Sequence, residues 1–263
     1  MKKSNYSIYT WLAILILIAA GTIVFEIKNS AAYMLEPRSE EIAKNKAKDN
    51  DTKETVGWIR VQGTNIDFPV LYAPDYDFAY EAGKFAWTEA KFDDLNNKIV
   101  ISGHNIKNMS KHPLIADPSH DRFEQLMSFI DYDFAKENQF IQYTFNGKDY
   151  LYKIFSVSFL KSRDIDLYNS IEYPLDELRD YINLSQRKSI YEYNTSVNEN
   201  DKILTLVTCT GIYDDEYMRI AVNARLVHEG EKVKLADVKT TSVYNDIEAI
   251  TKGGDLDEEI DEV

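Results

Sequence analysis

Cysteine is almost absent from this sequence, because Cys209 is the single cysteine among 263 residues. One thiol excludes an internal disulfide and any cysteine-rich zinc site. Basic residues are also scarce, with 30 lysines and arginines against 44 acidic residues and a formal net charge of −14. Proteins that bind duplex nucleic acid need a basic face to displace counterions, so no nucleic-acid partner is expected. No internal repeat is visible.

Charge is missing from the 22 positions between Lys3 and Glu26. A helix of that length spans roughly 33 Å, close to the hydrocarbon core of a bilayer. Lysines precede the apolar run, which favours a cytoplasmic N-terminus. We therefore expect residues 1–28 to form a cytoplasmic stub and a transmembrane anchor. The chain would then be a single-pass protein of the cell membrane with an extracellular body.

A cleaved signal peptide is the alternative interpretation of the N-terminus, with Ser30-Ala31-Ala32 as a small-residue cleavage site. The body is exported in either case. Residues 29–54 are polar and rich in charge, which is typical of a solvated stalk or an exposed N-terminal helix.

The body is expected to begin near Thr55 and to be dominated by strands. Patterns of apolar residues and turn signals predict eight strands, at 55–61, 66–72, 85–88, 98–102, 139–145, 149–160, 202–209 and 217–227. The fifth and sixth flank Asn146-Gly147, a strong hairpin signal.

Two helices are expected between these strands. One follows Asp121, which can cap it, and the other runs from Pro174 to about Lys188 with Leu175, Leu178 and Ile182 on one face. Strands that follow one another without a regular helix between them make a doubly wound parallel sheet a poor fit. The pattern favours a mainly β (α+β) fold, a closed or nearly closed barrel with helices inserted in its loops.

The chain turns polar after this body. Six of the nine residues at 255–263 are acidic, so residues 229–263 are expected to be an acidic, disordered tail.

Three side chains stand where a catalytic site could form. Cys209 ends the apolar run 203–207, His104 follows the run 98–102, and Arg219 comes ten residues after the cysteine. A thiol becomes a nucleophile when a base removes its proton or a cation stabilises the thiolate, and His104 can do either. Strand alternation points Arg219 away from the apolar layer, and a permanently charged guanidinium can stabilise an oxyanion.

Each of these residues also has a structural interpretation. A lone cysteine in an apolar strand is commonly a small core residue, and the chain would then be a non-catalytic exported barrel that binds peptides. Metal binding is weakly indicated by His112 and His120, or by the acids at 214–216. We expect no metal and no other cofactor.

Several motifs together resemble one family. TLVTC at 205–209 is similar to the TLxTC signature of the sortases, the exported cysteine transpeptidases of Gram-positive bacteria, and SGHN at 102–105 matches the segment around that family's histidine. Arg219 has the family's spacing from the cysteine. VGWIRVQGTNIDFPV at 56–70 resembles the opening of the class B branch. The resemblance covers roughly 55–228, which we take as the catalytic domain.

This resemblance implies a closed eight-stranded barrel with Cys209 as nucleophile, His104 as general acid and base, and Arg219 as the residue that stabilises the oxyanion or substrate. Thr208 and Thr210 are its candidate substrate contacts, although class B enzymes often carry an acidic or polar residue directly after the cysteine, where this chain has Thr210.

The implied reaction cleaves a C-terminal sorting signal of a secreted surface protein after threonine. The thioester on Cys209 then passes to an amine of the peptidoglycan precursor. The alternative acceptor is a pilin lysine, which would make the enzyme a pilin polymerase taking part in pilus assembly.

Overall fold

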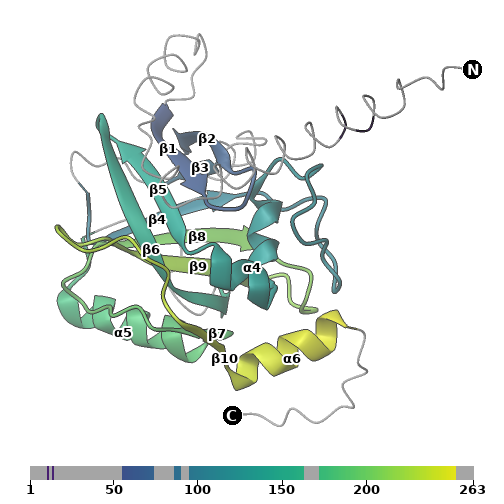
Figure 1. The fold of residues 1–263 in the computed structure, drawn as a ribbon. Helices are drawn as coiled ribbons and strands as arrows, with labels where there is room; N and C mark the ends of the chain where they lie inside the picture. The colour runs from purple at the N-terminus through teal and green to yellow at the C-terminus, as the bar shows by residue number, and fades with distance from the viewer. Residues whose placement is uncertain are drawn as a thin grey trace, which may run out of the picture.

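Eight strands close into one barrel in the computed structural model, which describes residues 55–73, 86–89, 95–162 and 172–252 together with the isolated positions 11 and 14. The order around the barrel is β1-β2-β3-β4-β8-β9-β6-β5 (Figure 1). The bounds are β1 Thr55–Val61, β2 Asp67–Tyr72, β3 Ala86–Thr88, β4 Lys98–Gly103, β5 Phe140–Phe145, β6 Lys148–Lys161, β8 Ile203–Cys209 and β9 Met218–Leu226. The expected closed, mainly β barrel and its eight strands are confirmed.

The pairing of β4 with β8 matters most for function. These strands run parallel, whereas β8 runs antiparallel to β9 and β9 antiparallel to β6. Parallel neighbours end at the same edge of a sheet, so the carboxyl ends of β4 and β8 lie together. Residues that follow these two ends are brought close although about a hundred positions separate them in sequence.

The turn between β5 and β6 follows from its two residues. Asn146 has φ 48° and Gly147 has φ 72°. Two consecutive positive φ angles are what a tight hairpin turn with the twist of the flanking strands requires, and asparagine and glycine tolerate them best. The predicted hairpin is confirmed.

The first helical segment differs from its prediction. It is a 3-10 helix, η2 (Phe123–Ile130), and its first cap is Arg122 without a side-chain hydrogen bond. The predicted cap by Asp121 is therefore wrong. The cap that does form belongs to the next helix, α4 (Tyr132–Glu137), where the Asp131 side chain accepts a hydrogen bond from the backbone N–H of Phe134.

The second predicted helix is α5 (Leu175–Arg187), which starts directly after Pro174. Its buried residues are Leu178, Tyr181, Ile182 and Ser185. Leu175 is half exposed, so its predicted place on the buried face is wrong. The buried face of α5 includes Tyr181 instead, a residue that the apolar pattern did not single out.

The expected disordered tail is wrong for most of its length. Residues 238–240 form β10 (Val238–Thr240), which pairs with β7 (Tyr191–Tyr193), and α6 (Ser242–Thr251) follows. In α6, Val243, Tyr244, Ile247 and Ile250 contact the main core. These apolar residues recur at helical spacing, and their burial outweighs the polarity of the residues between them. Residues 253–263 lie outside the described part of the chain.

The predicted anchor at 1–28 and stalk at 29–54 lie outside the described residues, apart from positions 11 and 14. Within the described ranges, no helix has both the length and the apolar character that crossing a bilayer demands.

Two apolar clusters sit on opposite faces of the barrel sheet. One includes Ile101, Leu206 and Val222 on the inner face of the barrel and extends to η2, β7, β10 and α6. The other lies between the outer face and α5, where Val100, Val207 and Ala221 meet Leu178 and Ile182. Alternation along each strand therefore separates an inner face from an outer face that α5 covers in part.

Candidate active site

The outer face of β4, β8 and β9 carries the candidate residues. On β8, Thr205 and Val207 face α5, and the same alternation puts Cys209 on that side. On β9, Ala221 and Asn223 face α5, so Arg219 shares their side. The three strands thus deliver their functional side chains to one face, beyond the part that α5 covers.

A buried polar network joins α5 to this face. The Tyr181 hydroxyl donates to Oδ1 of Asn223 at 2.8 Å and lies 3.0 Å from Oγ1 of Thr205, and Asn223 donates to Oγ of Ser156 at 3.0 Å. Burial raises the pKa of Tyr181 to about 12, so its hydroxyl stays a neutral donor. The network ties α5 to β8 and β9, because the buried hydroxyl of Tyr181 finds its hydrogen-bond partners on these two strands.

A buried cation lies further along the same face. Lys98 of β4 is 0% exposed, and its Nζ lies 4.3 Å from the ring centroid of Tyr181 and 4.8 Å from that of Tyr173. The negative faces of the two aromatic rings partly replace the water that the ammonium loses on burial. Lys98 therefore helps to hold α5 on the sheet at the end away from Cys209.

His104 and Cys209 come level with each other because β4 and β8 are parallel. Their last paired residues are Ser102 and Val207, and two further steps along both chains reach His104 and Cys209. Both side chains are half-buried. The ring centroid of His104 lies 4.7 Å from that of Trp87, with 49° between the planes, which limits the positions open to the imidazole.

Two hydrogen bonds hold the histidine and cysteine backbones together. One residue before the pair, the Thr208 hydroxyl donates to the carbonyl of Gly103 at 2.6 Å. One residue after the histidine, the Asn105 amide donates to the carbonyl of Cys209 at 2.9 Å. The two bonds bracket the pair, so the relative position of thiol and imidazole is set by β4, β8 and these side chains.

Arg219 lies directly across from Cys209 in the antiparallel ladder of β8 and β9. Its Nη1 donates to the carbonyls of Glu216 at 2.6 Å and Met218 at 2.8 Å. These contacts hold the guanidinium at the start of β9, the strand that pairs with the end of β8. A planar, permanently charged guanidinium in that place can bind a carbonyl oxygen on which negative charge develops.

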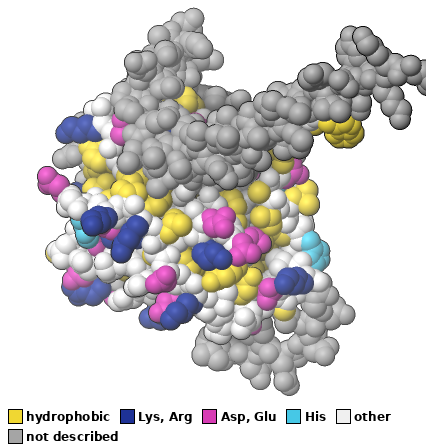
Figure 2. Space-filling model, in the orientation of Figure 1, with side chains coloured by type: hydrophobic (Ala, Val, Ile, Leu, Met, Phe, Trp, Pro, Cys, Tyr) yellow, Lys and Arg dark blue, Asp and Glu magenta, His cyan; other side chains and the backbone are white. Residues whose placement is uncertain are grey.

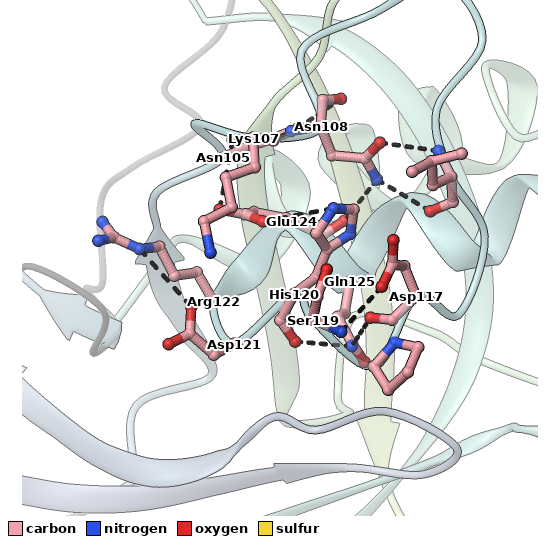
Figure 3. Close-up of polar contacts among 12 residues, drawn as sticks. Asn105, Lys107, Asn108, Asp117, Ser119, His120, Asp121, Arg122, Glu124 and Gln125 are labelled. Atoms are coloured by element: carbon pink, nitrogen blue, oxygen red, sulfur yellow. Dashed lines mark hydrogen bonds and ion pairs between the residues drawn. The ribbon is translucent and has the colours of Figure 1, made fainter.

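The loop after His104, residues 105–120 and here named the His loop, is held by buried polar contacts (Figure 3). Asn108 is 2% exposed; its amide donates to the carbonyls of Leu114 and Glu124, and its Oδ1 accepts from the N–H of Leu114. The Asn105 Oδ1 accepts from the N–H of Asn108 at 3.1 Å. The His loop is therefore built on two asparagines, one of which also bonds the Cys209 backbone.

The loop between β8 and β9, residues 210–217 and here named the Cys loop, packs directly on the His loop. Lys111 and Asp214 form an ion pair at 2.9 Å. A Cβ placed on Gly211 would lie 2.6 Å from the backbone nitrogen of Ser110, so only glycine permits this approach. The two loops that follow His104 and Cys209 thus form one continuous rim.

Thr208 and Thr210 are both buried, at 2% and 3% exposure. The Thr210 hydroxyl accepts from the N–H of Ile212 at 3.2 Å, and the Thr208 hydroxyl bonds Gly103. Both hydroxyls are engaged within the protein and support the Cys209 backbone. Substrate contact by these two side chains stays a prediction that their placement does not favour.

The residues considered for a metal are not brought together. Nδ1 of His112 faces the carbonyl of Thr251, while His120 is buried with Nε2 4.0 Å from a carboxylate oxygen of Glu124. Across the described ranges, no three histidine, cysteine or acidic side chains are grouped as metal ligands. Asp214 and Asp215 instead pair with Lys111 and Lys161.

A cleft of about 830 Å³ opens between the Cys loop, the start of β9 and α6, and its lining does not include Cys209, His104 or Arg219. Its lining comes from the ends of β6 and α5, from the Cys loop and the start of β9, and from α6, namely Phe159, Leu160, Lys161, Leu184, Lys188, Tyr213, Asp214, Asp215, Met218, Val243 and Asp246. Leu160 pairs with Arg219 across β6 and β9. The cleft is large enough for several residues of a peptide.

Sequence patterns alone did not assign roles to Asn105 and Tyr181. Asn105 directly follows His104 within SGHN, and that position was a signal for a positioning role. Tyr181 lies three residues after Leu178, so a helical wheel that counts tyrosine as partly apolar would have found it.

The comparisons with known proteins agree with this geometry. The sortase domain family matches residues 59–227. Sortase B of Listeria monocytogenes is 28% identical over 187 residues, which cover 66% of this chain and 70% of that protein. The crystal structure of Clostridium perfringens sortase B is 28% identical with a TM-score of 0.58, covering 71% of this chain and 100% of that one.

A Staphylococcus aureus sortase B–substrate complex has the same fold at 21% identity, with a TM-score of 0.56 over 78% of this chain and 90% of that chain. The family match extends over most of the chain and includes every barrel strand from Ile59 of β1 to the end of β9. The relatives that match along the barrel are class B enzymes. This chain belongs to the sortase family of cysteine transpeptidases.

Proposed function

We propose that this chain is a membrane-anchored, extracellular class B transpeptidase. It cleaves a C-terminal sorting signal after threonine and joins the protein to an amine of the cell-wall peptidoglycan precursor. The observation that carries this proposal is the placement of His104 level with Cys209 at the ends of parallel strands, with Arg219 across the ladder. The uncharged run between Lys3 and Glu26 supports the anchor.

Acylation follows from these positions. The Cys209 sulfur attacks the threonyl carbonyl and forms a C–S bond while the carbonyl oxygen gains negative charge, which Arg219 stabilises. The C–N bond to the next residue then breaks, and His104 gives a proton to the departing amine. The products are a thioester on Cys209 and a free C-terminal fragment.

Transfer reverses the proton movement. An incoming amine attacks the thioester and loses a proton to His104, and the Cys209 sulfur departs. An amide bond replaces the thioester, so no external energy source is required. Water would release the same protein as an acid, and a bound, oriented amine outcompetes it because orientation provides effective concentrations of roughly 10⁵ M or more. The cleft lined by Met218 and the Cys loop offers room for such an acceptor.

Product analysis tests this function. The full-length chain in detergent is incubated with a pool of threonine-containing sorting peptides and, in separate arms, with a peptidoglycan-type amine or a lysine peptide of pilin type. We expect cleavage after threonine and a new amide with the peptidoglycan-type amine. Transfer to the lysine peptide alone would replace wall anchoring by pilin polymerisation, and no cleavage in any arm would reject the proposed substrate class.

A further inference from the structure

The described chain continues as a folded segment beyond the sortase domain. The family match ends at residue 227, whereas the structure continues through β10 and α6 to Lys252. We refer to residues 229–252 as the C-terminal segment. Its β10 pairs with β7, and the Tyr132 hydroxyl of α4 donates to the carbonyl of Val238 at 3.0 Å. The segment is therefore attached to the barrel before α6 begins.

Helix α6 is fixed by apolar contacts along one face. Ile247 is 1% exposed, and the ring of Tyr244 lies 5.4 Å from the ring of Tyr191 in β7. Val243 and Ile250 pack against the same core. A ten-residue helix is marginal alone, so this packing is what gives α6 a defined position. Figure 1 shows α6 on the same side of the barrel as α5.

The C-terminal end of α6 reaches the His loop. Nδ1 of His112 donates to the carbonyl oxygen of Thr251 at 2.5 Å. The last four carbonyls of a helix have no partner within it, and a histidine placed there satisfies one of them and complements the helix dipole. His112 is exposed, so its ring could have been solvated instead, yet it caps a helix that lies 139 residues further along the chain.

The His loop connects His112 to the residues around Cys209 through three contacts. Lys111, its neighbour, pairs with Asp214 of the Cys loop. Ser110 packs against Gly211, two residues after Cys209. Asn105, at the start of the His loop, donates to the carbonyl of Cys209. A displacement of the His loop would therefore loosen three supports of the cysteine.

We propose that the C-terminal segment positions the active site, and that His112 is the positioning residue through which it acts. The segment holds the His loop against the Cys loop, and this fixes Asn105 on the Cys209 carbonyl. The inference rests on the proposed role of Cys209 and deepens it. It assigns a function to a folded segment that lies outside the family domain.

Two substitutions at His112 distinguish a positioning role from a general loss of stability or activity. His112→Ala removes the donor, whereas the amide of His112→Asn has a donor near the place of Nδ1. For His112→Ala we expect faster backbone amide exchange over residues 105–116, by about three- to tenfold, because the loop opens more often. We also expect the acylation kcat to fall about tenfold with little change in KM. His112→Asn should restore both values.

His228→Ala is the matched control. His228 is also exposed and contacts carboxylates, those of Asp201 and of Glu231 at the start of the C-terminal segment, but at the opposite end of β8 from Cys209 and away from α6 and the His loop. It should leave loop exchange and acylation unchanged. Unchanged exchange and kcat in His112→Ala, or an Asn variant as impaired as the Ala variant, would overturn the proposal. Amide exchange needs no substrate, so it tests the loop support even if the proposed reaction failed in the parent chain.

Discussion

Single side chains fix the relative position of thiol and imidazole. Thr208 and Asn105 each bond backbone across the gap between β4 and β8, one residue from the proposed catalytic pair. Arg219, which pairs with Cys209 in the ladder of β8 and β9, is held by the carbonyls of Glu216 and Met218. Preorganised groups of this kind act without rearranging during the reaction, which is where electrostatic stabilisation is most effective.

Arg219→Lys tests whether the planar guanidinium group is needed at this position. Lysine retains the charge but has a single compact donor group, so it cannot bond the Glu216 and Met218 carbonyls and face a substrate oxygen in the same way. We expect kcat/KM for peptide cleavage to fall about 10²-fold, with the melting temperature unchanged. A loss smaller than about twofold would show that only charge is needed at this position.

At the scale of elements, the barrel strands were predictable and the helices only in part. Alternation and the Asn146-Gly147 turn are local signals, and they located all eight barrel strands. The face of α5 depends on Lys98, Thr205 and Asn223, which reach Tyr181 from distant strands. No local pattern contains that information, so Leu175 was misassigned.

The candidate triad was predictable because motif and spacing placed its members at strand ends, whereas the support from Asn105 depends on strand pairing. The C-terminal segment was misjudged because the strongly acidic end at 255–263 dominated the interpretation of a neighbouring amphipathic helix.

Two leucines of α5 test its observed face. Leu178 is 0% exposed, and Leu178→Ala should lower the free energy of unfolding by about 3 kcal/mol through lost contacts and a cavity. Leu175 is 50% exposed, and Leu175→Ala should change it by no more than about 0.5 kcal/mol. Urea unfolding of both variants measures the difference, and equal losses would contradict the observed orientation of the helix.

At the scale of the whole molecule, the sequence has a formal net charge of −14 and a C-terminal segment folds back on the barrel. On the face drawn in Figure 2, lysine and arginine side chains lie among aspartate and glutamate side chains. At the end of β9 the chain turns, and Arg225 forms a bidentate salt bridge with Glu231. Its Nη1 and Nη2 donate to the two carboxylate oxygens at 2.6 and 2.9 Å. This salt bridge joins the end of the family domain to the start of the C-terminal segment.

The Arg225 pair makes part of the stability depend on pH. Hydrogen bonds from Arg225 lower the pKa of Glu231 from 4.5 to about 2. A depressed carboxyl pKa stabilises the fold above pH 4.5, and this contribution is lost as the pH falls toward 2. Glu231→Gln should therefore lower the melting temperature at pH 7, and the difference from the parent chain should shrink below pH 4.5. A difference that stays constant with pH would contradict the assignment.

Mass spectrometry of the acylated enzyme after digestion tests the central claim most directly. The full-length chain is mixed with a sorting peptide, quenched in acid, digested and searched for a thioester, with Cys209→Ala treated in parallel. We predict an acyl group on Cys209 that ends at the threonyl carbonyl and is absent from the variant. The absence of any adduct, with a Cys209 that resists alkylation in the folded protein, would make the thiol structural and the barrel a peptide-binding module.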